Sequence, residues 1–197
     1  PYTRVQCFSR VHPDLKRMGI DMAADELRIG FIGAGRMATA LAAGLTAAKI
    51  VPASAIIAGD VWAAGRERFA AATGARVTED NSEVFQEADV IFVAVKPQSL
   101  PVVLTEIQGL VEERHLLISI LAGIPLKAFD AKLGSGRRLV RVMPNTPCLV
   151  GESASGFALG GVATPEDGEL VNKLLSSVGV AVEVPERLLD AVTGLSG

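Results

Sequence analysis

The chain has 197 residues and a formal net charge of −3, with 19 Lys and Arg residues against 22 Asp and Glu residues. This length suits one full domain plus part of another, and the lack of a basic surplus excludes electrostatic binding of nucleic acid as its main activity. Hydrophobic residues make up 49% of the chain and aromatic residues 5%, so an aliphatic core is expected, as in a buried parallel sheet.

Two features bear on the compartment. Cys7 and Cys148 lie far apart without metal-binding or redox spacing, which predicts two free thiols in a reducing compartment. The longest apolar runs are strand-length and fall short of the ~20 residues that a bilayer span needs. We therefore expect a cytoplasmic protein with no membrane and no nucleic acid among its partners. Residues 1–22 lack periodicity and are expected to be a disordered or non-native extension.

From residue 23 to about 184 the sequence alternates between strand-like and helical patterns. Short β-branched runs bounded by turn residues predict strands at 28–32, 55–58, 76–77, 90–95, 116–120, 138–143, 155–159 and 180–184. Runs that begin at a capping residue or a proline predict helices at 37–48, 63–73, 82–87, 100–111, 125–133 and 165–177. This alternation predicts an α/β fold with a doubly wound, mostly parallel sheet. The last two strands depart from the alternation and are expected to close one edge of the sheet, with an antiparallel direction left open.

A glycine-rich loop follows the first predicted strand. Residues 33–38 read Gly-Ala-Gly-Arg-Met-Ala, the G-x-G-x-x-A spacing of a dinucleotide-binding fingerprint, and continue into an alanine-rich helix. Gly33 permits the tight turn, Gly35 lets the backbone approach a pyrophosphate, and Ala38 lets the helix pack closely on the strand. The start of the helix supplies free N–H groups and a positive dipole end. These features predict a Rossmann-like dinucleotide-binding domain.

The end of the second predicted strand is the expected adenosine end of the cofactor site. Asp60 follows the strand, and an acid there accepts hydrogen bonds from a ribose diol and repels a 2′-phosphate, which favours NAD(H). Arg36, Arg66 and Arg68 could pair with such a phosphate, which would favour NADP(H). The residues alone leave both cofactors open, and each arginine taken singly is better interpreted as a solvated helix charge.

Further strand ends are expected at the same carboxyl edge, where open α/β sheets bind ligands. Lys96 and Pro97 follow the fourth strand, and Lys96 is either a cofactor contact or an ordinary strand-end cation. Ala122 and the run Met-Pro-Asn-Thr-Pro at 143–147 follow the next two strands. Small residues and a proline-fixed loop at these places would form a floor for a flat nicotinamide ring.

The sequence offers no evident protein catalyst. His12 lies in the extension and His115 lies among charged residues at an expected helix-to-strand corner, so both are interpreted as bystanders. Cys148 is interpreted as a small residue packed in a turn and not as a reactive thiol. No Ser/His/Asp or Cys/His set and no metal-binding cluster can be assembled at the sheet edge. An enzyme whose cofactor carries the chemistry needs no such group, which favours hydride transfer to an electrophilic carbon.

Four motifs, in this order, resemble the pyrroline-5-carboxylate reductase family: IGFIGAGRM at 29–37, AVKP at 94–97, MPNTP at 143–147 and DAVTGLSG at 190–197. The resemblance covers about residues 27–197. It implies reduction of 1-pyrroline-5-carboxylate to L-proline, the last step of proline biosynthesis, by hydride transfer from NAD(P)H, with NADP(H) favoured over NAD(H). It implies no catalytic residue and no metal site within this chain.

The resemblance also implies a set of cofactor-binding positions. Residues 32–37 are expected to bind the pyrophosphate, and Asp60 and Asn81 are expected at the adenosine end. Residues 94–97 are expected along the cofactor, and residues 120–122 and Asn145 are expected nearer the nicotinamide. With the fingerprint alanine, the set is Ile32, Gly33, Ala34, Gly35, Arg36, Met37, Ala38, Asp60, Asn81, Ala94, Val95, Lys96, Pro97, Ile120, Leu121, Ala122 and Asn145. Asp60 departs from the Ser, Thr or Asn that family members often carry there.

Family members continue after the last motif into a helical domain that dimerises and carries the substrate carboxylate loop. Residues 185–197 are therefore expected to begin such a domain, the rest of which is missing from this chain. The chain alone is expected to bind the cofactor weakly and to be inactive, and the full-length protein to be a homo-oligomer. Two alternatives remain: another Rossmann reductase of the β-hydroxyacid dehydrogenase type, and a non-catalytic dinucleotide-binding module.

Overall fold

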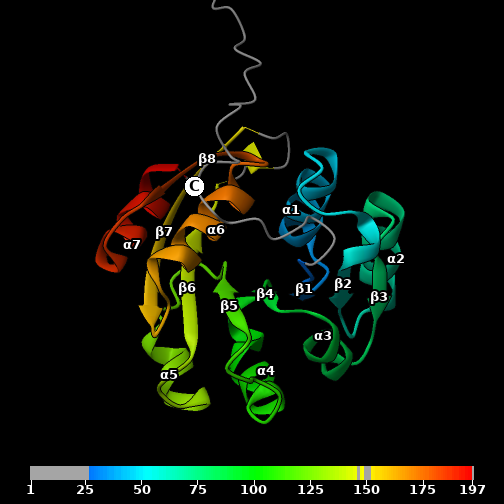
Figure 1. The fold of residues 1–197 in the computed structure, drawn as a ribbon, viewed down its shortest axis with the longest axis horizontal. Coiled ribbons are helices and arrows are strands. Elements are labelled where there is room, and N and C mark those ends of the chain that lie inside the picture. Colours follow the sequence, from blue (N-terminus) through cyan, green and yellow to red (C-terminus); the bar gives the residue numbers. More distant parts are fainter. Residues whose placement is uncertain (1–26, 146, 149–151, 197) are drawn as a thin grey trace, which may run out of the picture.

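The computed structural model describes residues 27–145, 147–148 and 152–196 (Figure 1). The expected extension at 1–22 lies outside the described residues. The strands are β1 (Ile29–Ile32), β2 (Ile56–Gly59), β3 (Arg76–Thr78), β4 (Val90–Val93), β5 (Leu116–Ser119), β6 (Arg138–Met143), β7 (Ser153–Gly161) and β8 (Gly179–Glu183). The helices are α1 (Arg36–Ala47), α2 (Ala63–Thr73), α3 (Asn81–Glu87), α4 (Leu100–Ile107), α5 (Lys127–Leu133), α6 (Pro165–Leu175) and α7 (Glu186–Ser196), with short 3-10 turns η2 (Ala53–Ala55) and η3 (Pro97–Ser99).

One sheet of eight strands forms the middle layer, in the order β3-β2-β1-β4-β5-β6-β7-β8. Strands β1 to β6 pair in parallel, which confirms the doubly wound, mostly parallel α/β fold. β7 runs antiparallel to β6, and β8 runs parallel to β7. The two strands that depart from the alternation therefore close one edge, and both run opposite to the rest.

Some predicted element bounds were wrong. β7 covers Ser153–Gly161 and not 155–159, because its end pairs with β6 as far as Gly161 and its start pairs with β8 from Ser153. α4 ends at Ile107 and not at 111, since Gly109 follows and glycine is a poor helix former. Strand β4 ends at Val93, so residues 94–96 of the AVKP segment form a loop at the carboxyl edge and Pro97 begins η3.

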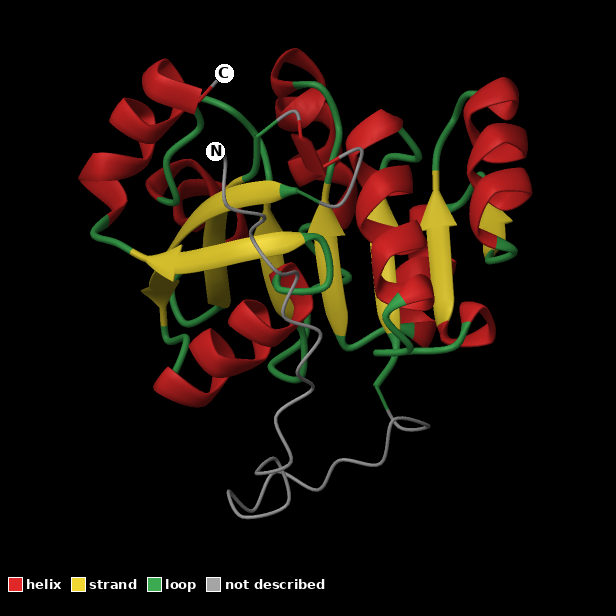
Figure 2. Cartoon of the chain, turned by 90° about the horizontal axis from the view of Figure 1, so that it is seen from above, coloured by secondary structure: helices red, strands yellow, loops and turns green. Residues whose placement is uncertain are grey.

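Helices cover both faces of the sheet, which is one twisted layer between them (Figures 1 and 2). On one face, α1, α2 and α6 enclose an apolar cluster in which the Phe31 ring centroid lies 5.0 Å from that of Phe92 and 5.7 Å from that of Phe69. On the other face, α3, α4 and α5 pack over a cluster that includes Val84 and Phe129. β1 is buried along its whole length, so the loop that follows it starts from a rigid base.

The end of the described chain packs on the same sheet. Leu189 of α7 is buried in a small cluster with Met143 of β6 and Ala158 of β7. The side chain of Arg141 on β6 is buried and forms ion pairs with Glu186 and Asp190 of α7. α7 is thus fixed to β6 and β7, and the expected domain boundary at 184–185 stays a prediction.

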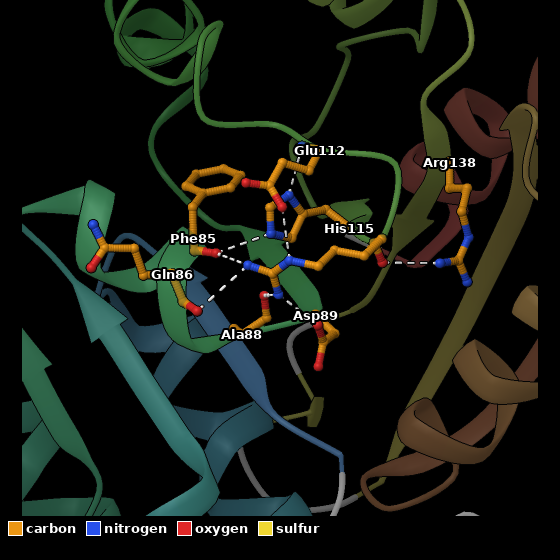
Figure 3. A network of polar contacts seen from close by, with 8 residues as sticks. Phe85, Gln86, Ala88, Asp89, Glu112, His115 and Arg138 are labelled. Atoms are coloured by element: carbon orange, nitrogen blue, oxygen red, sulfur yellow. Dashed lines mark hydrogen bonds and ion pairs between the residues drawn. The ribbon is translucent and has the colours of Figure 1, made fainter.

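The amino edge of the sheet carries a polar network in which His115 and its neighbour Arg114 bind groups of Phe85, Asp89 and Glu112 (Figure 3). His115 precedes β5 and is 1% exposed. The Glu112 backbone N–H donates to its Nδ1 at 2.8 Å, so Nε2 carries the proton and donates to the Phe85 carbonyl at 3.0 Å. Arg114 pairs with Asp89 at 2.6 Å in the same network. His115 therefore joins α3 to β5 at the edge opposite to the carboxyl ends, which agrees with its interpretation as a bystander.

Candidate functional site

The carboxyl ends of the parallel strands form one continuous edge. Ile32, the last residue of β1, pairs in register with Gly59 of β2 and with Val93 of β4. Backbone hydrogen bonds extend this pairing into the loops: the Gly33 N–H donates to the Gly59 carbonyl at 2.7 Å, and the Ala94 N–H donates to the Ile32 carbonyl at 2.8 Å. The structure thus brings together the loops that the sequence places after β1, β2 and β4.

The two fingerprint glycines meet different surroundings. Gly33 has φ +99°, and a Cβ atom there would lie 2.9 Å from the Ala94 carbonyl oxygen. Gly35 has φ −76° and ψ −179°, and a Cβ atom there would have no neighbour within 4 Å. Gly33 is therefore required by the fold itself. Gly35 faces open space, which is where a ligand would need close backbone approach.

The start of α1 is suited to an anion. Gly35 is its N-cap and makes no capping hydrogen bond through a side chain, and the first turn contains no acid. Arg36 follows and is exposed. The first N–H groups of the helix therefore have no intrahelical partner and lie at the positive end of its dipole. A phosphate group fits this combination of free donors and positive charge.

Asp60 links the first two loops of the edge. One of its carboxylate oxygens accepts from the Ala34 N–H at 2.8 Å, and the other accepts from the Trp62 N–H at 2.9 Å. The acid therefore fixes the fingerprint loop against the end of β2. Sequence reasoning assigned Asp60 only to a ribose diol, and this second role was missed.

The arginines after β2 also have separate partners. Arg66 donates from Nη1 to the Asp60 carbonyl at 2.6 Å and lies 3.4 Å from Glu79. Arg68 places its guanidinium carbon 4.4 Å from the ring centroid of Trp62, and its Nε donates to the Ala64 carbonyl at 3.0 Å. Trp62 was not selected from the sequence, although it is the single tryptophan of the chain and comes two residues after Asp60.

Asn81, which the family resemblance puts at the adenosine end, lies beside the end of β2. Its Nδ2 donates to Glu106 at 2.9 Å, and the side chain is buried. A Cβ atom on Gly59 would lie 2.4 Å from the Asn81 amide oxygen. Gly59 therefore provides the room in which the Asn81 side chain sits.

Comparison with known proteins identifies the family. Residues 28–123 match a family model described as NADP oxidoreductase coenzyme F420-dependent. The chain is 47% identical over 170 residues to the pyrroline-5-carboxylate reductase of Methanosarcina acetivorans, which covers 86% of this chain and 63% of that protein. It is 42% identical over 180 residues to pyrroline-5-carboxylate reductase 2 of Homo sapiens, which covers 87% of this chain and 55% of that protein. This chain belongs to the pyrroline-5-carboxylate reductase family.

Solved structures of this family share the fold. A pyrroline-5-carboxylate reductase from Coxiella burnetii matches with a TM-score of 0.82 and 29% identity over 87% of this chain and 64% of that chain. The Plasmodium falciparum enzyme, solved with NADP bound, matches with a TM-score of 0.79 and 31% identity over 88% of this chain and 63% of that chain. The chain carries an NAD(P)-binding Rossmann domain, and it spans 55% to 64% of the length of these four relatives.

The positions that the family resemblance puts nearer the nicotinamide follow β5 and β6. Ala122 is exposed and Ile120 is half-buried. The Leu121 side chain is 2% exposed and packs in the core, so only its backbone is available to a ligand. The Asn145 side-chain oxygen accepts from the Ala154 N–H at 3.0 Å, which fixes the connection from β6 to β7.

The remaining positions of the family set divide by burial. Lys96 and Pro97 are exposed at the start of η3, where they are open to a ligand. Val95 and Met37 are partly buried and pack against the two core clusters. Ala38, in the first turns of α1, is fully buried in the core cluster that this helix covers, which fits the helix-packing role of the fingerprint alanine.

Other chemical groups near the edge are few in the described part of the chain. Cys148 is buried, and this burial raises the pKa of its thiol, so it is a packed residue and not a thiolate. Thr146 of the MPNTP motif lies outside the described residues. Within the described ranges, no three His, Cys, Asp or Glu side chains form a metal-binding group. No helix of the described part has the length and apolar character that a membrane crossing requires.

Proposed function

We propose that this chain is the coenzyme-binding part of a pyrroline-5-carboxylate reductase, which reduces 1-pyrroline-5-carboxylate to L-proline with NADPH in preference to NADH. The open space at Gly35, beside the uncapped start of α1, carries this proposal. Family membership supports the substrate, and the NADP bound to the Plasmodium falciparum relative supports the coenzyme. By the same relationship we expect the whole protein to be a homo-oligomer.

The residues around Gly35 suit the diphosphate of such a coenzyme. The free N–H groups of α1 would donate to its oxygens, and the exposed Arg36 would add positive charge. Asp60 already holds the Ala34 N–H, so the loop keeps its shape before the ligand arrives. A site that is ordered in advance loses less entropy on binding.

In the proposed reaction, the main task of the protein is to orient the coenzyme and the substrate. When bound, a reduced nicotinamide would supply a hydride to the C5 imine carbon of the substrate. The exposed Ala122 and the half-buried Ala94 would give the coenzyme ring a surface of small side chains. Protonation of the ring nitrogen of the substrate, by solvent or by a bound hydroxyl, makes C5 more electrophilic. No protein nucleophile is required.

Calorimetric titration of the chain with NADPH and NADH tests the coenzyme site, and saturable binding that is tighter for NADPH is the expected result. The substrate is tested in the whole protein, where NADPH oxidation should depend on 1-pyrroline-5-carboxylate and form L-proline. Oxidation of 3-hydroxy acids in place of this reaction would assign the protein to the β-hydroxyacid dehydrogenase type. Binding of NADPH by the whole protein with turnover of neither substrate would leave a non-catalytic dinucleotide-binding module.

A further inference from the structure

A stacked pair of side chains stands at the end of β2, beside the proposed diphosphate site. Trp62 is the N-cap of α2 and is 57% exposed. Arg68, one and a half turns into the helix, holds its guanidinium carbon 4.4 Å from the Trp62 ring centroid. The Trp62 ring also lies over Gly65, since a Cβ atom there would be 3.2 Å from it and 3.6 Å from the Asp60 carboxylate. Trp62, Arg68 and Asp60 therefore share one patch of surface.

The other charged groups of this patch are already engaged. Asp60 uses both carboxylate oxygens on backbone N–H groups. Arg66 is bonded to the Asp60 carbonyl and paired with Glu79. Arg68 uses only its Nε, and among the described residues its two Nη groups have no hydrogen-bond or ion-pair partner. Arg68 is thus the preplaced cation of this patch whose terminal donors remain free.

We propose that Arg68, held over Trp62, binds the 2′-phosphate of NADP(H) and determines the coenzyme preference. This inference rests on the proposed coenzyme site. A guanidinium binds phosphate through paired, charge-assisted hydrogen bonds. Its stacking on Trp62 limits the side-chain freedom that binding would otherwise remove. The nearby Asp60 carboxylate repels a second anion, so a 2′-phosphate can be accommodated only if a cation such as Arg68 faces it. The exposed Trp62 ring offers the adjoining surface for adenine stacking.

Two nucleotides isolate the 2′-phosphate from the rest of the coenzyme: adenosine 2′,5′-bisphosphate and adenosine 5′-monophosphate. We expect the unmodified chain to bind the bisphosphate tighter by roughly tenfold or more, the value of one hydrogen bond between charged groups. Arg68→Gln should bring the two affinities together. Arg66→Gln is the matched control, with the same substitution on the same helix, and should keep the ratio because Arg66 is bonded elsewhere.

The ratio of the two affinities decides the result. Three results would overturn the inference while the reductase proposal stands. The unmodified chain could bind the two nucleotides equally well, or Arg68→Gln could keep the preference for the bisphosphate. The third result is that Arg66→Gln loses this preference and Arg68→Gln does not. Failure of the unmodified chain to bind either nucleotide or NADPH would overturn the coenzyme site, and this inference with it.

Tryptophan fluorescence gives a second readout. Trp62 is the single tryptophan among the 197 residues, so the emission reports on this patch alone. Both nucleotides should quench it on binding, and nicotinamide mononucleotide, which has no adenine, should not. Calorimetric binding of either adenine nucleotide without any change in emission would show that adenine lies away from Trp62.

Discussion

Substitution of the two fingerprint glycines should separate binding from folding. A Cβ atom at Gly35 would have no neighbour within 4 Å, and the backbone there is extended, a conformation that valine adopts readily. Valine is a weaker N-cap than glycine, so Gly35→Val should lower the free energy of unfolding by less than about 1 kcal/mol. Its branched side chain would occupy the space proposed for the diphosphate. Loss of two charge-assisted hydrogen bonds, each worth about 1.5 to 3 kcal/mol, would weaken NADPH binding by at least about 100-fold.

Gly33→Ala should have the opposite outcome. The φ of +99° and a Cβ placed 2.9 Å from the Ala94 carbonyl oxygen predict a loss of stability. Left-handed strain and overpacking each cost on the order of 1 to 3 kcal/mol, against roughly 5 to 15 kcal/mol for a whole domain. Urea denaturation measures the stability of both variants, and calorimetry with NADPH measures binding. The assignment of Gly35 to coenzyme binding would be refuted if a folded Gly35→Val protein bound NADPH as tightly as the unmodified chain. The assignment of Gly33 to folding would be refuted if Gly33→Ala were as stable as the unmodified chain.

Three further predictions concern the links between elements. Asp60→Ala removes the acceptor of two backbone N–H groups and should lower the free energy of unfolding by about 1 to 3 kcal/mol, measured in urea; unchanged stability would contradict its linking role. Burial lowers the pKa of His115 below its usual 6.5, so the unfolded chain takes up the proton first and stability should fall as the pH drops below about 6.5. His115→Gln should flatten that dependence in urea titrations at several pH values, and an equally steep slope would exclude His115 as its source. Arg141→Met removes the ion-pair partner of Glu186 and Asp190, and should speed hydrogen exchange of the backbone amides in α7 but not in β1. Equal changes in exchange rate in both elements would contradict the view that Arg141 fixes α7 locally.

The sheet could largely be predicted because its parallel strands are buried on both faces. β1, β4 and β5 are short apolar runs of the kind such burial demands. The first two residues of β7, Ser153 and Ala154, could not be predicted, because Ser153 is buried beside Ser155 without an apolar pattern. The hydroxyls of the two serines are satisfied by each other at 2.9 Å, and Ser153 also donates to Asn145 at 3.2 Å. Such partners are set by tertiary structure, which a strand pattern does not record.

At the site too, contacts between residues that are close in sequence could be predicted, and contacts between residues that are far apart could not. The fingerprint loop could be predicted because the turn, the glycines and the helix start lie within a few residues of one another. The partner of Asp60 could not, because Ala34 lies 26 residues earlier in the chain. The ion pair of Arg66 with Glu79 was hidden for the same reason, since only the fold brings the ends of β2 and β3 together.

Because of these contacts, the presence of Asp60 after β2 does not by itself indicate which coenzyme binds. The sequence rule treats such an acid as a free acceptor for a ribose diol. In this chain Asp60 already bonds the fingerprint loop and the start of α2, so the fold has a use for it with either coenzyme. Its presence is therefore compatible with a 2′-phosphate, provided that a cation offsets its charge. The selectivity is then assigned to Arg68, whose terminal donors are unpaired in the described structure.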